Sequence, residues 1–229
     1  MWKSRGVLTA NALAGCFISL EGTEGSGKTT IAQWIAAELR ARGASAIVTR
    51  EPGGTAIGEE IRSVLLGAAS GTMVPETEML LFAAARAQHV KEFIQPALKR
   101  GLVVITDRFT DSSLAYQSGG RGLPMEDVAA AQLLAVGNLH PDVTVLLDLP
   151  VTVGLERRFS SDDGVNRLDS ETVRFHERVR ETYLSLAAAE PGRWRIIDAS
   201  QDQSDVCKEV WMAVSACALP ASDHGRQQS

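Results

Sequence analysis

The sequence predicts a three-layer α/β domain in which a parallel β-sheet lies between two layers of helices. Five short apolar runs are rich in β-branched residues and continuous rather than alternating, as expected of strands buried on both faces. Helical periodicity follows each run, and this order favours parallel pairing through right-handed crossovers. The 229 residues contain no repeat and no Pro/Gly-rich linker, so they predict a single domain.

The elements can be placed in order along the chain. The predicted strands are residues 17–20, 46–49, 102–105, 143–147 and 195–197. The predicted helices lie at about 28–42, 56–66, 75–99, 125–139, 171–189 and 205–218. Gly43 and Gly101 stand where a helix C-cap would lead into the next strand. We expect a loose N-terminal extension over residues 1–15, the domain over 16–219 and a disordered tail over 220–229.

The composition excludes several classes of function. Hydrophobic residues make up 45% and charged residues 22%, which is ordinary for a soluble domain with a real core. The net charge of −5 argues against a nucleic-acid coat or a polybasic membrane binder. No run of about 18 apolar residues is present, so a spanning helix is not expected. The three cysteines cannot make a disulfide framework and lack metal-ligand spacing, which favours a reducing compartment, the cytoplasm.

The N-terminus has one feature that suggests export. Lys3 and Arg5 precede a mildly apolar stretch that ends in residues 13–16, Leu-Ala-Gly-Cys, and this ending resembles a lipoprotein cleavage box. Thr9 and Asn11 interrupt the stretch, however, and it is short for a signal peptide. Cleavage would also leave Cys16 at the edge of a strand that the fold needs, so we favour a cytoplasmic protein.

A phosphate-binding motif follows the first strand and opens the first helix. It matches G-x-x-x-x-G-K-[ST] at Gly22, Thr23, Glu24, Gly25, Ser26, Gly27, Lys28 and Thr29, and we add Thr30 to the ATP-binding set. Glycines let successive amides point at phosphate oxygens, and the helix N-terminus adds partial positive charge. Lys28 is predicted to bridge the β- and γ-phosphates of ATP, and the Thr29 hydroxyl to hold Mg²⁺. The expected architecture is therefore a P-loop NTPase fold with a five-stranded parallel sheet flanked by helices; the alternative is a simple glycine turn.

The third predicted strand ends in a carboxylate, which supports the P-loop interpretation. Asp107 follows the apolar run 103–106, an arrangement that places an aspartate beside the magnesium of a P-loop, although a turn-forming aspartate is the alternative. No guanine-reading N-K-x-D tetrad occurs in the chain, which argues against a GTPase switch. The chain also has no room for the additional domains of ATPase machines.

Several further motifs resemble those of thymidylate kinases. They are Asp107-Arg108-Phe109 with Ser112-Ser113 and Ala115-Tyr116-Gln117, Thr49-Arg50-Glu51-Pro52-Gly53-Gly54-Thr55, Leu81-Phe82 with Arg86 and Gln88-His89, and Pro141-Asp142-Val143-Thr144 running to Gly154-Leu155 and Arg157. The likeness extends from about residue 17 to 199 in the family's order. It implies transfer of the γ-phosphoryl of ATP to dTMP, giving ADP and dTDP for dTTP synthesis, by a homodimer.

The resemblance also assigns the acceptor site. Phe82 and Arg86 share one helix face, which suits a pyrimidine stacked on a ring and hydrogen-bonded at its edge. The family implies that Phe82 stacks on thymine and Arg86 bonds a thymine carbonyl; the alternative is a core phenylalanine beside a solvated arginine. The family further implies roles in dTMP binding for Arg50, Glu51, Arg108, Ser112, Ser113, Tyr116 and Gln117. Among these, Arg108 and Arg50 are the candidates for the acceptor phosphate, and Tyr116 packs under the deoxyribose. His89 is better interpreted as a structural histidine than as a ligand.

The lid, about residues 154–168, must supply a catalytic arginine, because the P-loop itself contains none. The candidates are Arg157 and Arg158, with Arg167 as a third in a segment that resembles the family's Asp-Arg-Ile-Glu. This chain has Ser160-Ser161-Asp162-Asp163-Gly164 where such lids usually carry more arginines, so the choice stays open. The alternatives to a dTMP kinase are another nucleoside or nucleotide kinase of this fold and a non-catalytic ATP-binding protein.

Overall fold

A five-stranded, all-parallel sheet forms the centre of the computed structural model, which describes residues 15–67, 73–160 and 165–219. The strand order is β2-β3-β1-β4-β5. The strands are β1 (Phe17–Glu21), β2 (Ala46–Arg50), β3 (Val103–Asp107), β4 (Val143–Asp148) and β5 (Trp194–Asp198). All five predicted strands and the three-layer fold are confirmed, and each strand lies within one or two residues of its predicted limits.

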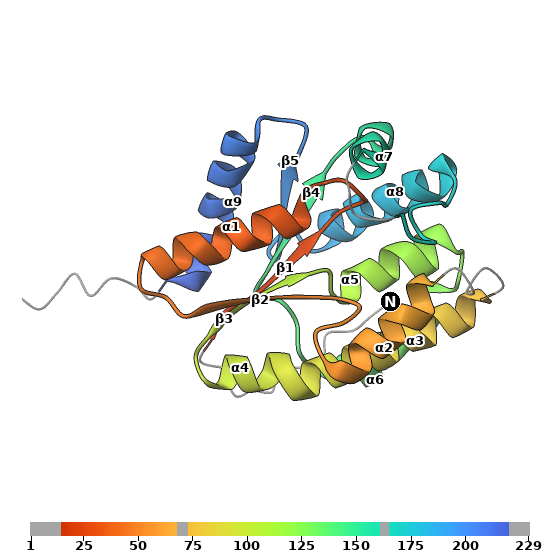
Figure 1. The fold of residues 1–229 in the computed structure, drawn as a ribbon, viewed down its shortest axis with the longest axis horizontal. Coiled ribbons are helices and arrows are strands. Elements are labelled where there is room, and N and C mark those ends of the chain that lie inside the picture. Colours follow the sequence, from red (N-terminus) through yellow and green to blue (C-terminus); the bar gives the residue numbers. More distant parts are fainter. Residues whose placement is uncertain (1–14, 68–72, 161–164, 220–229) are drawn as a thin grey trace, which may run out of the picture.

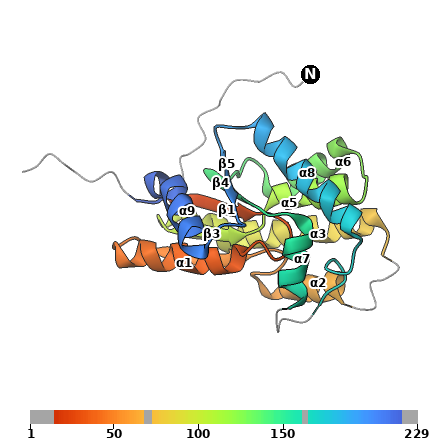
Figure 2. The ribbon, with the colours of Figure 1, turned by 90° about the horizontal axis from the view of Figure 1, so that it is seen from above.

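Helices cover both faces of the sheet (Figures 1 and 2). One face carries α1 (Lys28–Ala41) and α9 (Gln203–Ala218), whose apolar side chains share a core with β1. The helices over the other face are α3 (Pro75–His89), η2 (Val90–Ile94), α4 (Gln95–Lys99), α6 (Met125–Val136) and α8 (Val173–Ala189). α2 (Ala56–Leu66) packs against α3.

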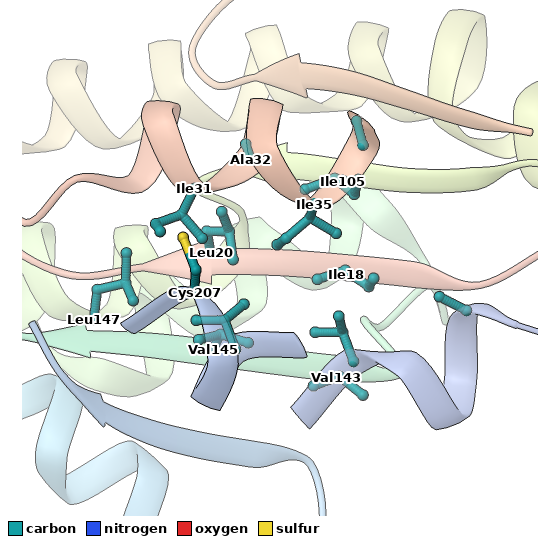
Figure 3. Packing of buried hydrophobic residues seen from close by; sticks show 14 of the residues in the cluster. Ile18, Leu20, Ile31, Ala32, Ile35, Ile105, Val143, Val145, Leu147 and Cys207 are labelled. Atoms are coloured by element: carbon teal, nitrogen blue, oxygen red, sulfur yellow. The ribbon is translucent and has the colours of Figure 1, made fainter. Parts of the chain in front are cut away.

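Both faces of β1 are buried, as the continuous apolar run predicted. Ile18 and Leu20 point to the α1 side and pack with Ile31 and Ile35 (Figure 3), whereas Phe17 belongs to the cluster on the opposite face. This double burial is the reason the strand sequence does not alternate between apolar and polar residues.

Two helical segments were missed by the sequence prediction. α5 (Thr110–Ser113) continues into the π-helical turn η3 (Leu114–Gly120), and α7 (Val151–Phe159) begins directly after β4. Both are short, and α5 is polar throughout, so neither gives the extended periodicity from which helices are recognised. The predicted helix 75–99 is continuous but includes a π-helical turn at η2.

The cysteine prediction was wrong for one pair. Cys16 and Cys217 form a disulfide across a sequence separation of 201 residues, while Cys207 is a buried free thiol. The bond joins the residue before β1 to the last turn of α9. Spacing along the chain could not reveal it, because the two cysteines meet only when α9 packs beside β1.

The carboxyl ends of the strands bring the predicted motifs to one edge of the sheet. The P-loop follows β1, the turn 51–55 follows β2, Asp107 ends β3, and the lid follows β4. Such edges are where ligands bind in open parallel sheets. None of the helices in the described part of the chain is long and apolar enough to cross a membrane. The predicted extension and tail lie outside the described residues, except for Gly15.

Candidate active site

The P-loop has the curled backbone that its sequence predicts. Gly22, Gly25 and Gly27 adopt positive φ values of 143°, 69° and 89°, which glycine tolerates readily. Gly25 must also lack a side chain, because a Cβ there would lie 2.0 Å from the carbonyl oxygen of Gly154 in α7. The P-loop can therefore pack closely on α7 only because residue 25 is a glycine.

Lys28 folds back over the loop. Its Nζ donates hydrogen bonds to the carbonyl oxygen of Thr23 at 2.8 Å and to Ser26 Oγ at 3.2 Å. Burial, with a smaller contribution from the nearby Arg108, lowers the pKa of the Lys28 ammonium to about 8, and neighbouring carboxylates limit the decrease. The ammonium is thus held against the P-loop by two of its own residues.

A hydroxyl and a carboxylate meet at the start of α1. β3 pairs with β1 so that Asp107 lies opposite Leu20, one strand away from the P-loop. Thr29 Oγ1 donates a hydrogen bond to Asp107 Oδ2 at 2.6 Å. Oxygen ligands of this kind are the ones that Mg²⁺ prefers, and one or two carboxylates with phosphates and water usually complete its shell. The residues present therefore fit the predicted magnesium site.

A cavity of about 800 Å³ opens beside the P-loop, a volume ordinary for a small-ligand site. It brings together most of the predicted site residues from the P-loop, the β2–α2 turn, α3, α5, η3 and the lid. Its lining includes Glu24, Gly25, Gly27, Lys28, Thr29, Thr30, Arg50, Glu51, Phe82, Arg86, Asp107, Arg108, Ser112, Ser113, Tyr116, Gln117, Arg157 and Arg158. Gly22, Thr23 and Ser26 form the loop without belonging to this lining.

Arg108 lines the cavity in a strained backbone conformation. Its φ of 75° is positive, which is uncommon for a residue with a side chain and often marks a functional site. Its guanidinium donates to the carbonyl oxygen of Gly22 at 3.1 Å and to Glu24 Oε1 at 3.1 Å, and it lies over the Tyr116 ring. Arg108 thus connects the P-loop to Tyr116.

Arg86 is more deeply buried than the sequence prediction implied. Its Nε donates to Glu51 Oε2 at 2.5 Å, Nη1 donates to Ser113 Oγ at 2.7 Å and also to Gln132, and Nη2 donates to the carbonyl oxygen of Phe109 at 2.9 Å. These contacts use four of the five N–H groups of a guanidinium. Within the described chain one Nη2 hydrogen is left for a ligand. The alternative of a solvated Arg86 is wrong, because the side chain is 2% exposed.

The other predicted polar contacts are already engaged within the protein. Ser112 Oγ donates to Glu21 at 2.6 Å, and Gln117 Nε2 donates to Glu78 Oε1 at 3.0 Å. His89 is fully buried, with Nε2 2.7 Å from Thr49 Oγ1 and Nδ1 3.0 Å from Glu51. These three side chains therefore support the walls of the cavity, and His89 is structural, as predicted.

The structure separates the three candidate lid arginines. Arg157 donates to the carbonyl oxygen of Ala199 at 3.1 Å, and Arg158 forms an ion pair with Asp169 at 2.8 Å; both line the cavity. Arg167 instead donates to Glu78 and is not among the residues that line the cavity in the described part of the chain. Two arginines of α7, at the start of the lid, thus face the site, and Arg167 ties the lid to α3.

Comparison with known proteins identifies the family to which a chain with this fold and this cavity belongs. Residues 20–210 match the family model described as thymidylate kinase. The chain belongs to the thymidylate kinase family. It is 50% identical to a thymidylate kinase of Pseudomonas syringae pv. tomato over 85% of this chain and 92% of the relative. Identity is 50% with a Thermomicrobium roseum thymidylate kinase (87% and 94% covered) and 52% with one from Geobacter sulfurreducens (81% and 90% covered).

Two residues of this family member escaped the sequence analysis. Glu21 is fully buried and accepts hydrogen bonds from Ser112, from the backbone N–H of Phe109 and from Tyr183. Burial, and then the charge of Asp111, raises the pKa of the Glu21 carboxyl. In the sequence, only the position of Glu21 directly before the first P-loop glycine could have pointed to a role in the site. Arg62 of α2 lines the cavity and donates to the carbonyl oxygen of Pro52 at 2.9 Å; no motif contains it.

Proposed function

We propose that this cavity transfers the γ-phosphoryl group of ATP to dTMP, giving ADP and dTDP. The activity follows from the thymidylate kinase relatives at about 50% identity. The assignment of residues to roles is our proposal. The observation that carries it is a single cavity that holds the P-loop lysine together with the acceptor residues Phe82, Arg86 and Tyr116.

On the donor side, the P-loop binds the phosphates of ATP. The amides of residues 22–30 and the N-terminus of α1 surround the β-phosphate, and Lys28 moves from its loop contacts to the β- and γ-phosphate oxygens. Thr29 and Asp107 would hold Mg²⁺, which neutralises phosphate charge when bound. The 2.6 Å separation of Thr29 Oγ1 and Asp107 Oδ2 supports this assignment.

On the acceptor side, each surface of dTMP has a matching group. Phe82 stacks on thymine, and the remaining Nη2 hydrogen of Arg86 donates to a thymine carbonyl. Tyr116 lies under the deoxyribose, where a ribose 2′-hydroxyl would clash. Arg108 and Arg50 bind the acceptor phosphate. Glu51 acts indirectly, because its carboxylate holds Arg86 in position.

Catalysis comes from positioning and charge neutralisation. The acceptor phosphate is itself an oxyanion nucleophile, so the site needs no strong general base. Lys28, Arg108 and the lid arginines Arg157 and Arg158 stabilise the charge that is spread over the transferring group. Closure of the lid region 154–168 excludes water, because an open site would hydrolyse ATP.

The acceptor specificity tests the proposal directly. Coupled ADP release is measured with dTMP, dCMP, dGMP and AMP as acceptors. We expect a strong preference for dTMP, and no preference would favour another nucleotide kinase of this fold. ATP binding without ADP release would favour a non-catalytic protein. Lys28→Ala should abolish turnover, whereas Phe82→Ala should mainly raise the KM for dTMP, because only the acceptor stacks on that ring.

We further propose that the enzyme is a homodimer. The outward faces of α2, α3 and α6 expose apolar side chains, among them Val64, Leu80, Leu133 and Leu134, the last of them 89% exposed. These three helices pack side by side (Figure 1), so together they offer an apolar surface that a second copy would cover. Light scattering of wild type and Leu134→Glu tests this: the wild type should have twice the monomer mass, and the variant should shift toward monomer.

We also propose a cytoplasmic location, where ATP is abundant, with residues 16–219 acting as one kinase domain. Disulfides are rare in that compartment, so the Cys16–Cys217 pair should be largely reduced in growing cells. Thiol alkylation in intact cells followed by mass spectrometry measures this. A fully oxidised pair would argue for export.

A further inference from the structure

Glu24 of the P-loop reaches across into the acceptor side of the cavity. Its Oε1 accepts hydrogen bonds from Tyr116 Oη at 2.6 Å and from Arg108 Nη2 at 3.1 Å. Burial alone would raise the pKa of this carboxyl, but His176, Arg108 and Lys28 lower it to about 2. The carboxylate is therefore ionised, and one of its oxygens already orients two acceptor residues.

The second carboxylate oxygen faces a histidine that no motif had identified. His176 Nδ1 lies 3.0 Å from Glu24 Oε2, and the imidazole is fully buried in the second turn of α8. Neither ring nitrogen has a hydrogen-bond partner of good geometry in the described chain, and Glu24 Oε2 has none either. The two groups thus face each other at ion-pair distance.

A role in packing alone does not account for this residue. The other buried positions of α8, such as Phe175, Val179 and Tyr183, contribute to an apolar cluster around Tyr116 and β4. An imidazole at position 176 adds nothing to such a cluster that an apolar side chain would not. A buried imidazole costs free energy unless a polar group compensates for its desolvation, and the ionised Glu24 carboxylate, 3.0 Å from Nδ1, is placed to do so.

We propose that His176 is a positioning residue for the acceptor nucleotide, acting through Glu24. This inference rests on the proposed dTMP kinase function. His176 restrains Oε2, so that Oε1 stays directed at Tyr116 and Arg108, the residues assigned to the deoxyribose and to the acceptor phosphate. Without the imidazole, the buried Oε2 turns toward other donors or recruits water, and the Tyr116–Glu24–Arg108 arrangement loosens before dTMP binds.

The first experiment compares His176→Phe, His176→Asn and Val179→Ala. Phenylalanine keeps a ring of similar size without polar atoms, asparagine restores a donor near the Nδ1 position, and Val179→Ala weakens α8 without touching Glu24. We expect His176→Phe to raise the KM for dTMP roughly tenfold or more while the KM for ATP stays within about twofold. His176→Asn should recover most of that loss. Val179→Ala should lower the melting temperature and leave both KM values unchanged.

A double-mutant cycle separates action through Glu24 from a general effect. If His176 works through that carboxylate, His176→Phe should change the Kd for dTMP much less in a Glu24→Gln background than in the wild type. Additive effects would overturn the inference, as would an unchanged dTMP KM in His176→Phe or an equal change for ATP. If His176→Phe does not fold, the same cycle is run with His176→Leu, which also lacks polar side-chain atoms. A wild type that phosphorylates no dTMP would instead refute the proposed function.

Discussion

At the scale of single residues, the site collects positive charge that the whole chain lacks. Seven basic and four acidic side chains line the cavity in the described structure, whereas the full sequence has a net charge of −5. Three of the four acidic side chains form ion pairs: Glu51 with Arg86, Glu24 with Arg108 and Asp169 with Arg158. These pairs fix the directions of the guanidinium groups before any nucleotide binds, so little reorganisation is needed during phosphoryl transfer.

The lowered pKa of Lys28 predicts a pH dependence for ATP binding. Below about pH 8 the ammonium is charged and attracts phosphate; above this pKa the free enzyme holds a neutral amine, and ATP must bind together with a proton. The Kd for ATP should therefore rise as the pH increases from about 7 to 9, by at most about tenfold per pH unit. Titration calorimetry in two buffers should show proton uptake above pH 8. The matched variant Lys28→Met should bind ATP weakly at every pH, and an unchanged wild-type Kd would contradict the assignment.

At the scale of elements, the packing of the P-loop on α7 can be tested with two glycines. Gly25→Ala combines a positive φ with a clash against the backbone of Gly154, whereas Gly43→Ala has the positive φ of 84° but open space around its Cβ. Gly43→Ala should cost about 1 kcal/mol of stability without a change in kinetics. Gly25→Ala should cost more and also weaken ATP binding, because the loop must move away from α7. Chemical denaturation and ATP titration measure both effects, and equal losses for the two variants would contradict the clash.

The lid offers a second prediction at this scale. Arg158 is anchored to the buried Asp169, whereas Arg157 has one hydrogen bond to a backbone carbonyl and can leave it at little cost. We therefore expect Arg157 to reach the transferring phosphoryl group. Arg157→Ala should lower kcat by about 10³-fold or more with a small change in KM, as for other arginine fingers. Arg158→Ala should have the smaller effect. The reverse ranking in steady-state kinetics would assign the role to Arg158.

The same helices and strands show which features could be predicted from the sequence and which could not. The buried strands and the P-loop were predictable because each is coded locally, by a continuous apolar run or by fixed spacing. Interactions between distant segments were not. Glu21 and Tyr183 are 162 positions apart, and the four hydrogen-bond donors that Arg86 uses within the protein reach residues at least 23 positions away. The residue types identified Arg86 as a candidate ligand of the nucleotide. They could not show that most of its N–H donors are used within the protein.

At the scale of the whole molecule, the nucleotide cavity and the disulfide lie at opposite ends of the sheet. The nucleotide cavity lies at the carboxyl ends of the strands, whereas the Cys16–Cys217 disulfide lies at the amino end of β1. The bond connects the first strand to the last helix, so it closes nearly the entire domain into one loop. A crosslink of this length restricts the unfolded chain strongly and, in the loop-entropy model, contributes up to about 5 kcal/mol.

The last prediction follows from this separation of site and crosslink. Reducing the disulfide should lower the melting temperature by several degrees, because the unfolded chain gains entropy, while the KM values for ATP and dTMP stay the same. Cys217→Ser should melt like the reduced wild type and be insensitive to reductant. Cys207→Ser is the matched control: it removes the buried free thiol beside the same helix and should keep the full response to reductant. Melting curves with and without dithiothreitol, paired with kinetics, measure both properties. A change in KM on reduction would show that the amino end of the sheet communicates with the site, which the rigid parallel sheet between them argues against.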